Sequence, residues 1–285
     1  MNTFLFDEFK PLSTSVWKQK IQVDLKGADY NETLLWKTEE DIVVKPFYTK
    51  EDRTNSLLKL PKEGFNICQS IFIDDEKIAN SLAIDSLNRG ANSILFNADK
   101  KFDYKKVLDK IDLKLITIYF NFTFLDDVFQ IELSRFCNTK FTFFPTDIIG
   151  HLAENGNWFI SLKEDYRKLE NIVSETNNSI SISGDLYQNA GATITQQLAF
   201  TLAHANEYLN HFGKEVASKI NFKFAVSGNY FFEIAKLRTF RVLWETLLDE
   251  YDVNNIETNI FTQPSLRNKT LYDYNVNMLR TTSEC

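Results

Sequence analysis

The sequence predicts an α/β fold in which strand–helix units build a parallel sheet. From Asn66 onward, short runs of β-branched and aromatic residues alternate with helical patterns of roughly 12 to 20 residues, the alternation expected of such units. Several of the runs are apolar on both faces, as strands buried on both sides of a parallel sheet require. A chain of 285 residues is long enough to form one large core.

The strand-like runs can be counted along the chain. They span residues 67–73, 92–98, 113–122, 140–145, 179–184, 220–228 and 256–263. Seven such units with right-handed crossovers fit either a doubly wound open sheet or an eightfold (β/α) barrel that lacks its last step. Periodicity alone leaves both architectures open.

The intervening helices show apolar stripes that should pack against the sheet. On the first helix the expected buried stripe is Ile78, Ala79, Leu82, Ala83 and Leu87. On the fifth it is Ile194, Leu198, Leu202, Ala205, Leu209 and Phe212, between a capping box at Thr193 and Gln196 and a C-cap at Gly213. On the sixth it is Leu237, Phe240, Trp244, Leu247 and Tyr251, which we interpret as core.

The two ends of the chain differ from the repeat. Residues 15–51 predict a helix, a turn at Gly27 and a short extended arm. At the other end, residues 272–285 are typical of the opening of a seventh helix. A closed barrel needs one more strand, and because an open sheet exposes two edges, we expect the natural chain to continue beyond residue 285.

Composition excludes several classes of protein. A formal charge of −7 argues against a nucleic-acid partner, since such binding depends on clustered Lys and Arg. Cys68, Cys137 and Cys285 are widely spaced and lack a C-x-x-C pair, which argues against a disulfide framework or a thiolate metal site. The sequence has no secretory leader and no run of about 18 apolar residues, so we expect a cytoplasmic protein with no membrane partner.

Histidines and carboxylates give weak signals of chemistry. His204 and His211 are seven residues apart, which places them roughly 10 Å apart along a helix and does not suit a metal pair, so we expect surface or subunit-contact residues. Asp147 and Asp185 follow strands, where an acid or base could act. Helix N-caps and loop hydrogen bonds are the favoured interpretation of both.

No phosphate-cradling or nucleophile motif of the common kinds occurs. If the fold is a barrel, the strand ends at its mouth are the place for any pocket. The candidate residues there are Thr146, Asp147, Asp185, Tyr187, Gln188, Asn229, Thr262 and Gln263. This set is poor in strong acids, bases and cations, so we expect no catalytic, cofactor-binding or metal-binding residue in the chain.

Five segments, found in the same order, resemble the cobalamin-dependent acyl-CoA mutases, methylmalonyl-CoA mutase above all. They are DLKGADYNETLLWKT at 24–38, VVKPFYTKED at 43–52, SISISGDLYQNAGATITQQLAFTLAHANEYL at 179–209, FFEIAKLRTFRVLW at 231–244 and TQPSLRNKTLYDYNVNMLRTTSE at 262–284. The resemblance implies a TIM-like (β/α) barrel, here incomplete, over residues 66–285. It implies that residues 1–65 form an N-terminal helix and an extended arm that contacts another subunit.

The sequence departs from that family at positions that serve catalysis there. The family's catalytic chains carry a Tyr-His pair whose His donates a hydrogen bond to the substrate thioester, and here the pair is Asp185 and Leu186. An aliphatic side chain has no such donor. A substrate-contacting Gln is replaced by Pro145, and a family Glu by Asn189. The Arg-bearing stretch that threads coenzyme A is missing before Ile67.

The resemblance therefore implies a non-catalytic small subunit. The chain lacks the Asp-x-His-x-x-Gly motif of cobalamin ligation, so no cofactor is expected in it, and adenosylcobalamin would enter the complex through a large catalytic subunit. The expected partner is that subunit in a heterodimer, with a homodimer possible in isolation. Two alternatives stay open: a competent mutase for a different acyl-CoA, and a stand-alone scaffold or binding barrel.

Overall fold

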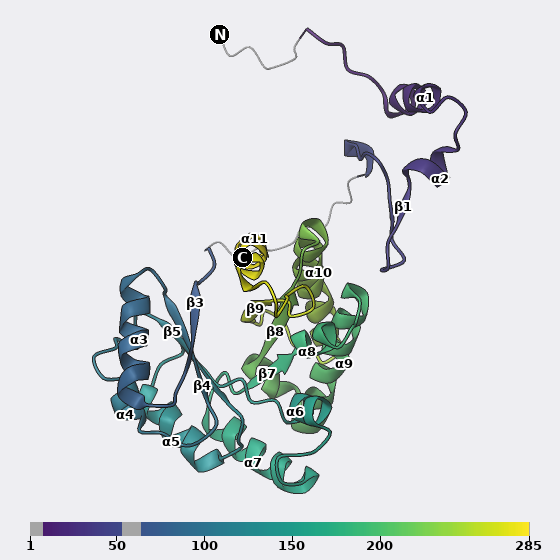
Figure 1. Cartoon of the computed structure of the whole chain (residues 1–285). Helices are drawn as coiled ribbons and strands as arrows, with labels where there is room; N and C mark the ends of the chain where they lie inside the picture. The colour runs from purple at the N-terminus through teal and green to yellow at the C-terminus, as the bar shows by residue number, and fades with distance from the viewer. Residues whose placement is uncertain (1–7, 53–63, 285) are drawn as a thin grey trace. The chain divides into compact units, whose positions relative to one another are not determined.

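A computed structural model describes residues 8–52 and 64–284, and contacts divide the chain into two units, residues 1–59 and 60–285 (Figure 1). The first unit contains α1 (Thr14–Asp24), α2 (Tyr30–Leu34), β1 (Trp36–Lys37), β2 (Val43–Val44) and η1 (Lys50–Asp52). Ser13 caps α1 and Asp29 caps α2. The strands form a small antiparallel hairpin. Among residues 8–52 no side chain is buried, so this arm has no core of its own.

The second unit is built on parallel strands. They are β3 (Cys68–Phe72), β4 (Ser93–Ala98), β5 (Thr117–Phe122), β6 (Thr142–Phe143), β7 (Ile180–Ser183), β8 (Ile220–Val226) and β9 (Ile260–Pro264). Neighbouring strands pair in chain order in two groups, β3 to β6 and β7 to β9. A parallel bridge between Thr146 and Ile180 joins the groups. Spatial order that follows chain order is the arrangement of a barrel and not of a doubly wound sheet.

Contacts across the sheet show that it curls. Tyr119 on β5 packs against Phe261 on β9, with ring centroids 5.1 Å apart, although three strands lie between β5 and β9 in the sheet order. Such a contact requires the sheet to bend around a lumen. Within the described residues β3 and β9 do not pair with each other, so the fold is a partial TIM-like barrel that stays open, as the sequence predicts.

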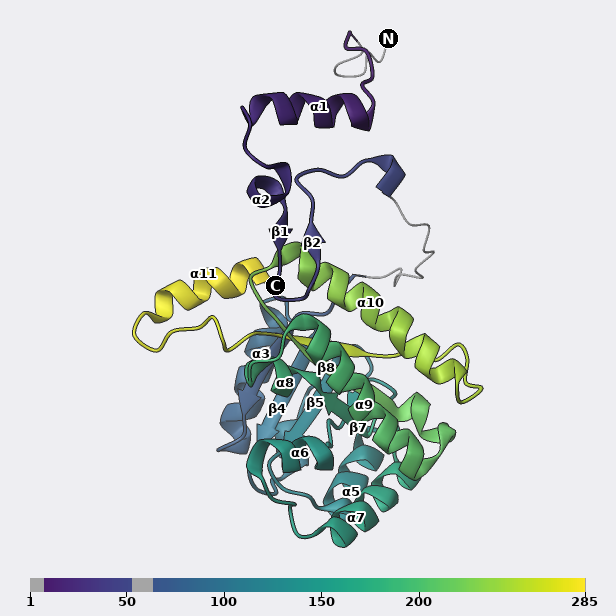
Figure 2. The ribbon, with the colours of Figure 1, turned by 90° about the vertical axis from the view of Figure 1, so that its right-hand side faces the viewer.

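Helices cover the outer face of the sheet (Figures 1 and 2). They are α3 (Glu76–Asn88), α4 (Tyr104–Val107), α5 (Asp127–Cys137), α6 (Ile148–Asn155), α7 (Leu162–Glu175), α8 (Gly184–Asn189), α9 (Ile194–Phe212), η2 (Lys214–Lys219) and α10 (Tyr230–Asp249). The last helix, α11 (Tyr274–Glu284), buries no side chain. None of the described helices is both long enough and apolar enough to cross a membrane.

The core consists of two hydrophobic clusters that correspond to the two groups of strands. One gathers side chains of β3 to β5 with those of α3 and α5, including Phe96, Phe120 and Leu133. The other gathers β7 and β8 with α9 and α10, including Phe222 and Trp244. Each half of the barrel therefore has its own close-packed interior.

The buried faces of α9 and α10 confirm the stripes predicted for them, whereas the buried face of α3 differs from its prediction. The capping box of Thr193 and Gln196 opens α9, Gly213 ends it, and Phe240 and Trp244 of α10 are buried. On α3, Ala79 and Ala83 are buried. Ile78 and Leu82 are 62% and 50% exposed, so their predicted burial is wrong. The small alanines are the side chains that meet the sheet, which leaves the flanking large residues outside.

Candidate functional site

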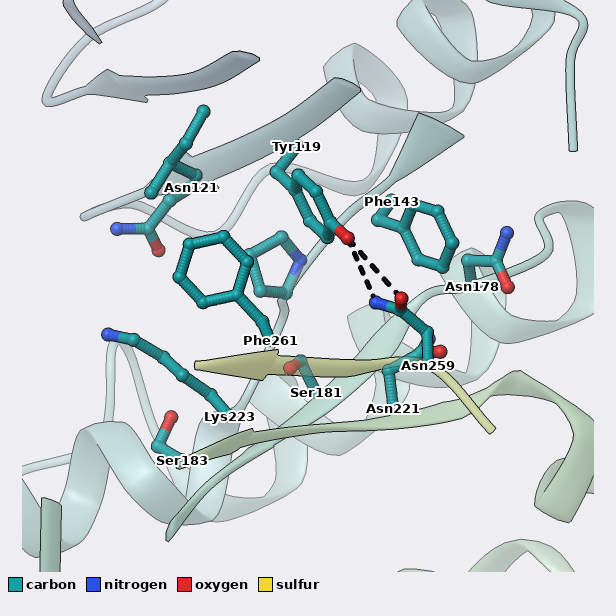
Figure 3. A pocket seen from close by; sticks show the side chains of 12 residues that line it. Tyr119, Asn121, Phe143, Asn178, Ser181, Ser183, Asn221, Lys223, Asn259 and Phe261 are labelled. Atoms are coloured by element: carbon teal, nitrogen blue, oxygen red, sulfur yellow. Dashed lines mark hydrogen bonds between the residues drawn. The ribbon is translucent and has the colours of Figure 1, made fainter. Parts of the chain in front are cut away.

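Aromatic side chains fill the lumen of the partial barrel (Figure 3). Tyr119 lies between Phe143, at a ring separation of 5.0 Å, and Phe261. Asn259, which directly precedes β9, donates a 3.0 Å hydrogen bond across the lumen to the Tyr119 hydroxyl. Burial raises the pKa of Tyr119 to about 12. The cavity that remains measures about 70 Å³, which is room for a few water molecules.

The rest of the cavity wall is made of amides, hydroxyls and one cation. The polar lining residues are Asn121, Asn178, Ser181, Ser183, Asn221, Lys223 and Asn259. Lys223 forms a 2.8 Å ion pair with Asp185. Asp185 is 8% exposed, and because its favoured interpretation was a cap or loop residue, the pairing with Lys223 corrects that expectation. Its Oδ2 is bound to this cation, whereas Oδ1 is buried and has no hydrogen-bond partner among the described residues.

Asp147 forms a second polar centre, at the end of β6 and outside the lumen lining. Its Oδ1 caps α6 by accepting from the Gly150 amide at 2.8 Å, as the N-cap interpretation predicts. The same oxygen accepts from the Tyr208 hydroxyl at 2.9 Å, and Oδ2 accepts from the Ser183 amide at 2.9 Å. His204 Nε2 lies 2.9 Å from Oδ1, at an angle that makes this a close electrostatic contact more than a directed hydrogen bond.

These contacts set the protonation of the centre. Burial pushes the pKa of Asp147 upward, but the charge and contact of His204, with the Gly150 and Ser183 amides, outweigh burial and hold it below its usual value. Burial and the Asp147 charge raise the pKa of Tyr208 well above its usual range, and they also raise that of Tyr187. Both phenols therefore keep their protons and remain hydrogen-bond donors.

The structure corrects the expected exposure of His204. It is 4% exposed, packed between Asp147 and Tyr187, whose hydroxyl lies 3.0 Å from Nδ1. His211 is exposed and lies 3.4 Å from Glu170, as a surface residue should. The seven-residue spacing correctly separates the two histidines but gives no information on burial, which depends on what packs over each turn of α9.

The residues after Tyr187 join α8 to the loop that follows β9. Gln188 is 6% exposed and accepts a 2.9 Å hydrogen bond from the buried Ser265 hydroxyl. Asn189 Oδ1 accepts from the Leu266 amide at 3.0 Å, and Arg267 donates to the Ala192 carbonyl at 3.2 Å. The Gln-Asn pair of the sequence thus serves structure at the mouth.

The remaining predicted mouth residues are dispersed. Thr146 donates to Gln130 at 3.1 Å, and Asn229 caps α10 by accepting from the Phe232 amide. Thr262 is exposed, and its register with Phe224 places it on the outer face of the sheet. Gln263 is half-buried and does not line the lumen cavity. The structure brings Asp147 and Tyr187 together through His204, keeps Asp185 and Gln188 with Tyr187 on α8, and places Asn229 and the β9 residues Thr262 and Gln263 elsewhere.

Sequence reasoning missed Tyr119, Asn259, Lys223 and Tyr208. Each finds its partner far along the chain, as Tyr119 and Asn259 do across 140 positions. Tyr208 offered a local signal, because it lies one helical turn after His204 on the buried face of α9.

The described residues do not fit a metal or the lower ligand of a cobalt. They contain no group of three or more His, Cys, Asp or Glu side chains that could hold a metal ion. His204 contacts Tyr187 and Asp147, and His151 stacks on Phe159 with ring centroids 3.5 Å apart. These two rings are thus occupied within the fold, and the exposed His211 lies near Glu170, away from the barrel mouth.

Comparisons with known proteins agree with the architecture. A family model described as "Methylmalonyl-CoA mutase" matches residues 138–285. The methylmalonyl-CoA mutase small subunit of Porphyromonas gingivalis W83 is 30% identical over 98% of this chain and 52% of its own length. The large subunit of Propionibacterium freudenreichii subsp. shermanii is 35% identical over 38% of this chain and 16% of its own length. The methylmalonyl-CoA mutase of Rhizobium meliloti 1021 is 48% identical over 26% of this chain and 11% of its own length.

Proposed function

Because this chain belongs to the methylmalonyl-CoA mutase family, we propose that it is the barrel portion of a non-catalytic small subunit that pairs with a large mutase subunit. The large subunit would bind adenosylcobalamin and isomerise the acyl-CoA substrate, for which we propose methylmalonyl-CoA and succinyl-CoA. The chain spans about half the length of the small subunit it matches, so these roles are proposed for the assembled protein.

The filled lumen is the observation that carries this proposal. A cavity of about 70 Å³ between Tyr119, Phe143 and Phe261 compares with about 300 Å³ or more for a small-molecule site. An acyl-CoA chain does not fit through it without displacing these rings. This supports a barrel whose interior serves as core, in preference to a competent mutase for another substrate.

The polar groups at the mouth support the same conclusion. Asp147 is shared among amides, a phenol and His204, Asp185 is paired with Lys223, and Leu186 has no polar group. A general acid or base needs a proton position that faces a substrate. Asp147 and Leu186 offer none, and the Asp185 carboxylate is held against Lys223.

The exposed apolar surface of the arm supports a partner subunit over a stand-alone scaffold. Residues 8–52 bury no side chain, yet they expose Phe9, Leu12, Val23, Ile42, Val43 and Tyr48. Exposed apolar side chains on a segment without a core are typical of a segment that folds against another chain. We propose the large subunit as that chain and the boundary near residue 65 as the end of the arm.

We also propose a cytoplasmic location. Cys68 and Cys137 are free thiols, and burial raises the pKa of each to about 12. Unpaired, unreactive thiols suit a reducing compartment.

The proposal is tested by co-expressing the chain with a large mutase subunit and measuring complex formation by size-exclusion chromatography with light scattering. Val23→Glu and Val43→Glu should each weaken association about tenfold or more, since a buried charge costs more than 1.4 kcal/mol. Ile78→Glu, an equally exposed apolar site on α3 outside the arm, is the matched control and should leave association unchanged.

Activity and ligand binding separate the alternatives. The isolated chain with adenosylcobalamin and methylmalonyl-CoA should show no turnover, and calorimetric titration with acyl-CoA should give no heat of binding. Saturable acyl-CoA binding by the isolated chain would favour the competent mutase. Failure to associate with any large mutase subunit would favour the scaffold and end the small-subunit proposal.

A further inference from the structure

We propose that Asp147, His204 and Tyr187 form a conformational latch that fixes α8 and, through it, the loop after β9 at the barrel mouth. The latch lies in the helical layer outside the lumen lining, whereas the loop lies at the carboxyl end of the sheet. A displacement of α8 relative to α9 would therefore also move this loop at the barrel mouth. This inference does not depend on the proposed function.

The inner end of the latch is rigid. The Asp147 carboxylate accepts from two backbone amides, Gly150 of α6 and Ser183 of β7, and from the Tyr208 hydroxyl. Both Asp147 and His204 are more than nine-tenths buried. The carboxylate holds the His204 ring at 2.9 Å, and the ring presents Nδ1 to Tyr187. Both oxygens of the Asp147 carboxylate have donors, which restricts the carboxylate to one arrangement.

The outer end is α8, a helix of six residues. Tyr187, Gln188 and Asn189 are consecutive and project about 100° apart around the helix axis. Tyr187 therefore reaches α9, while its two neighbours reach Ser265 and Leu266 on the opposite side. A rotation of so short a helix that breaks the first contact must also move the other two.

The loop after β9 transmits this position to α11. The Ser265 hydroxyl that donates to Gln188 also accepts from the Arg267 amide at 3.2 Å. Beyond it, Lys269 forms a 2.5 Å ion pair with Glu284 of α11. The loop presents Leu271 and Tyr272, which are 94% and 99% exposed. The latch thus fixes the base of a loop whose tip is free to meet other molecules.

The latch is accessible from solvent at Tyr187. Tyr187 is half-buried beside Phe200, which is 47% exposed, with ring centroids 5.5 Å apart. Either the phenol or Nδ1 can be the donor in this contact, depending on the tautomer of His204.

Hydrogen exchange on the full chain tests this link. Tyr187→Phe removes the hydroxyl and keeps the ring against Phe200. We expect the amides of Leu266 and Arg267 to exchange about tenfold faster, because their acceptors are Asn189 and Ser265. The amide of Phe96, in the other half of the barrel, should keep its rate. Asn189→Ala should raise the Leu266 rate directly, and adding Tyr187→Phe to it should give little further change.

Tyr251→Phe is the matched control. The Tyr251 hydroxyl lies 2.7 Å from the Oδ1 atoms of Asn206 and Asn210 on the same helix, α9, and donates to one of them, but it has no bond to α8. This variant should leave the Leu266 and Arg267 rates unchanged. Unchanged rates in Tyr187→Phe would overturn the latch, and so would an equal rise in Tyr251→Phe, which would mean that α9 had loosened as a whole. A change in association with a large subunit bears on neither outcome.

Discussion

Asp147 satisfies two kinds of demand with one buried carboxylate, since it caps α6 and also holds His204 and Tyr208 of α9. The cap alone can be served by an amide, because Asn and Asp cap helices about equally well. The contact with His204 cannot, because it depends on the negative charge. The two roles can therefore be separated by a substitution that keeps the shape of the side chain.

Asp147→Asn should destabilise the chain by about 3 kcal/mol, as expected for breaking a buried pair from one side. Urea unfolding followed by circular dichroism measures this change. Asp75→Asn is the matched control, because Asp75 caps α3 with two amides at an exposed site and has no buried histidine contact. The control should change stability by less than about 0.5 kcal/mol. Equal losses in both variants would show that capping is the whole role of Asp147.

The same carboxylate predicts a dependence of stability on pH. Its pKa is lowered in the folded chain, so its contribution is fully present above the unfolded value of 3.8 and is lost as the pH falls through the lower folded value. Below about pH 4 the stability of the wild-type chain should thus fall more steeply than that of Asp147→Asn. Urea midpoints of both proteins between acidic and neutral pH provide the comparison, and parallel curves would contradict it.

At the scale of elements, the start of α8 depends on a close approach to α9 and β8. A Cβ added to Gly184 would lie 2.5 Å from the Thr201 hydroxyl oxygen and 3.0 Å from the Lys223 carbonyl. Thr201 is fully buried and Lys223 O belongs to the backbone, so neither can move away easily. The glycine is required by space and not by its backbone angles.

Gly184→Ala should destabilise the chain by about 1–3 kcal/mol through overpacking. Gly228→Ala, where a Cβ meets nothing within 4 Å, should be neutral or slightly stabilising, since alanine restricts the unfolded chain. Thermal unfolding of the two variants measures both changes in stability. A neutral Gly184→Ala would mean that α8 can shift outward at little cost.

The elements also show what the sequence could predict. Strand positions, the caps of α9 and the core face of α10 follow from periodicity, because each depends on neighbours in the chain. β6 is shorter than predicted, since of residues 140–145 only Thr142 and Phe143 pair as a strand. The burial of His204 and the partner of Asp185 depend on residues from other strands and helices, which a local pattern does not contain. The differences from the family's catalytic chains that we expect at Leu186 and Pro145 come only from the resemblance and not from a local pattern.

At the scale of the whole molecule, two hydrophobic clusters divide the barrel into halves, and the lumen contacts join them. Within each half the strands pair with their neighbours in the chain. Tyr119 and Asn259, by contrast, connect β5 to the start of β9 across 140 positions. The lumen is therefore where side chains of the two halves contact each other.

This division has a consequence for how fast the chain folds and unfolds. Contacts between distant positions cost the most loop-closure entropy and tend to form after local ones. Tyr119→Phe, which removes the hydroxyl bonded by Asn259, should cost about 1 kcal/mol and act mainly by speeding unfolding. Ile94→Val, inside one half, should instead slow folding. Stopped-flow measurements in urea resolve the two rates, and slowed folding in Tyr119→Phe would contradict this order.

The aromatic contacts in the lumen therefore also bear on the order of folding. If each half collapses first, the meeting of the Tyr119, Phe143 and Phe261 rings in the lumen is the final step of self-assembly. The lifetime of the native state is then set at the seam between the halves, where a few side chains on β5, β6 and β9 determine how often the barrel opens.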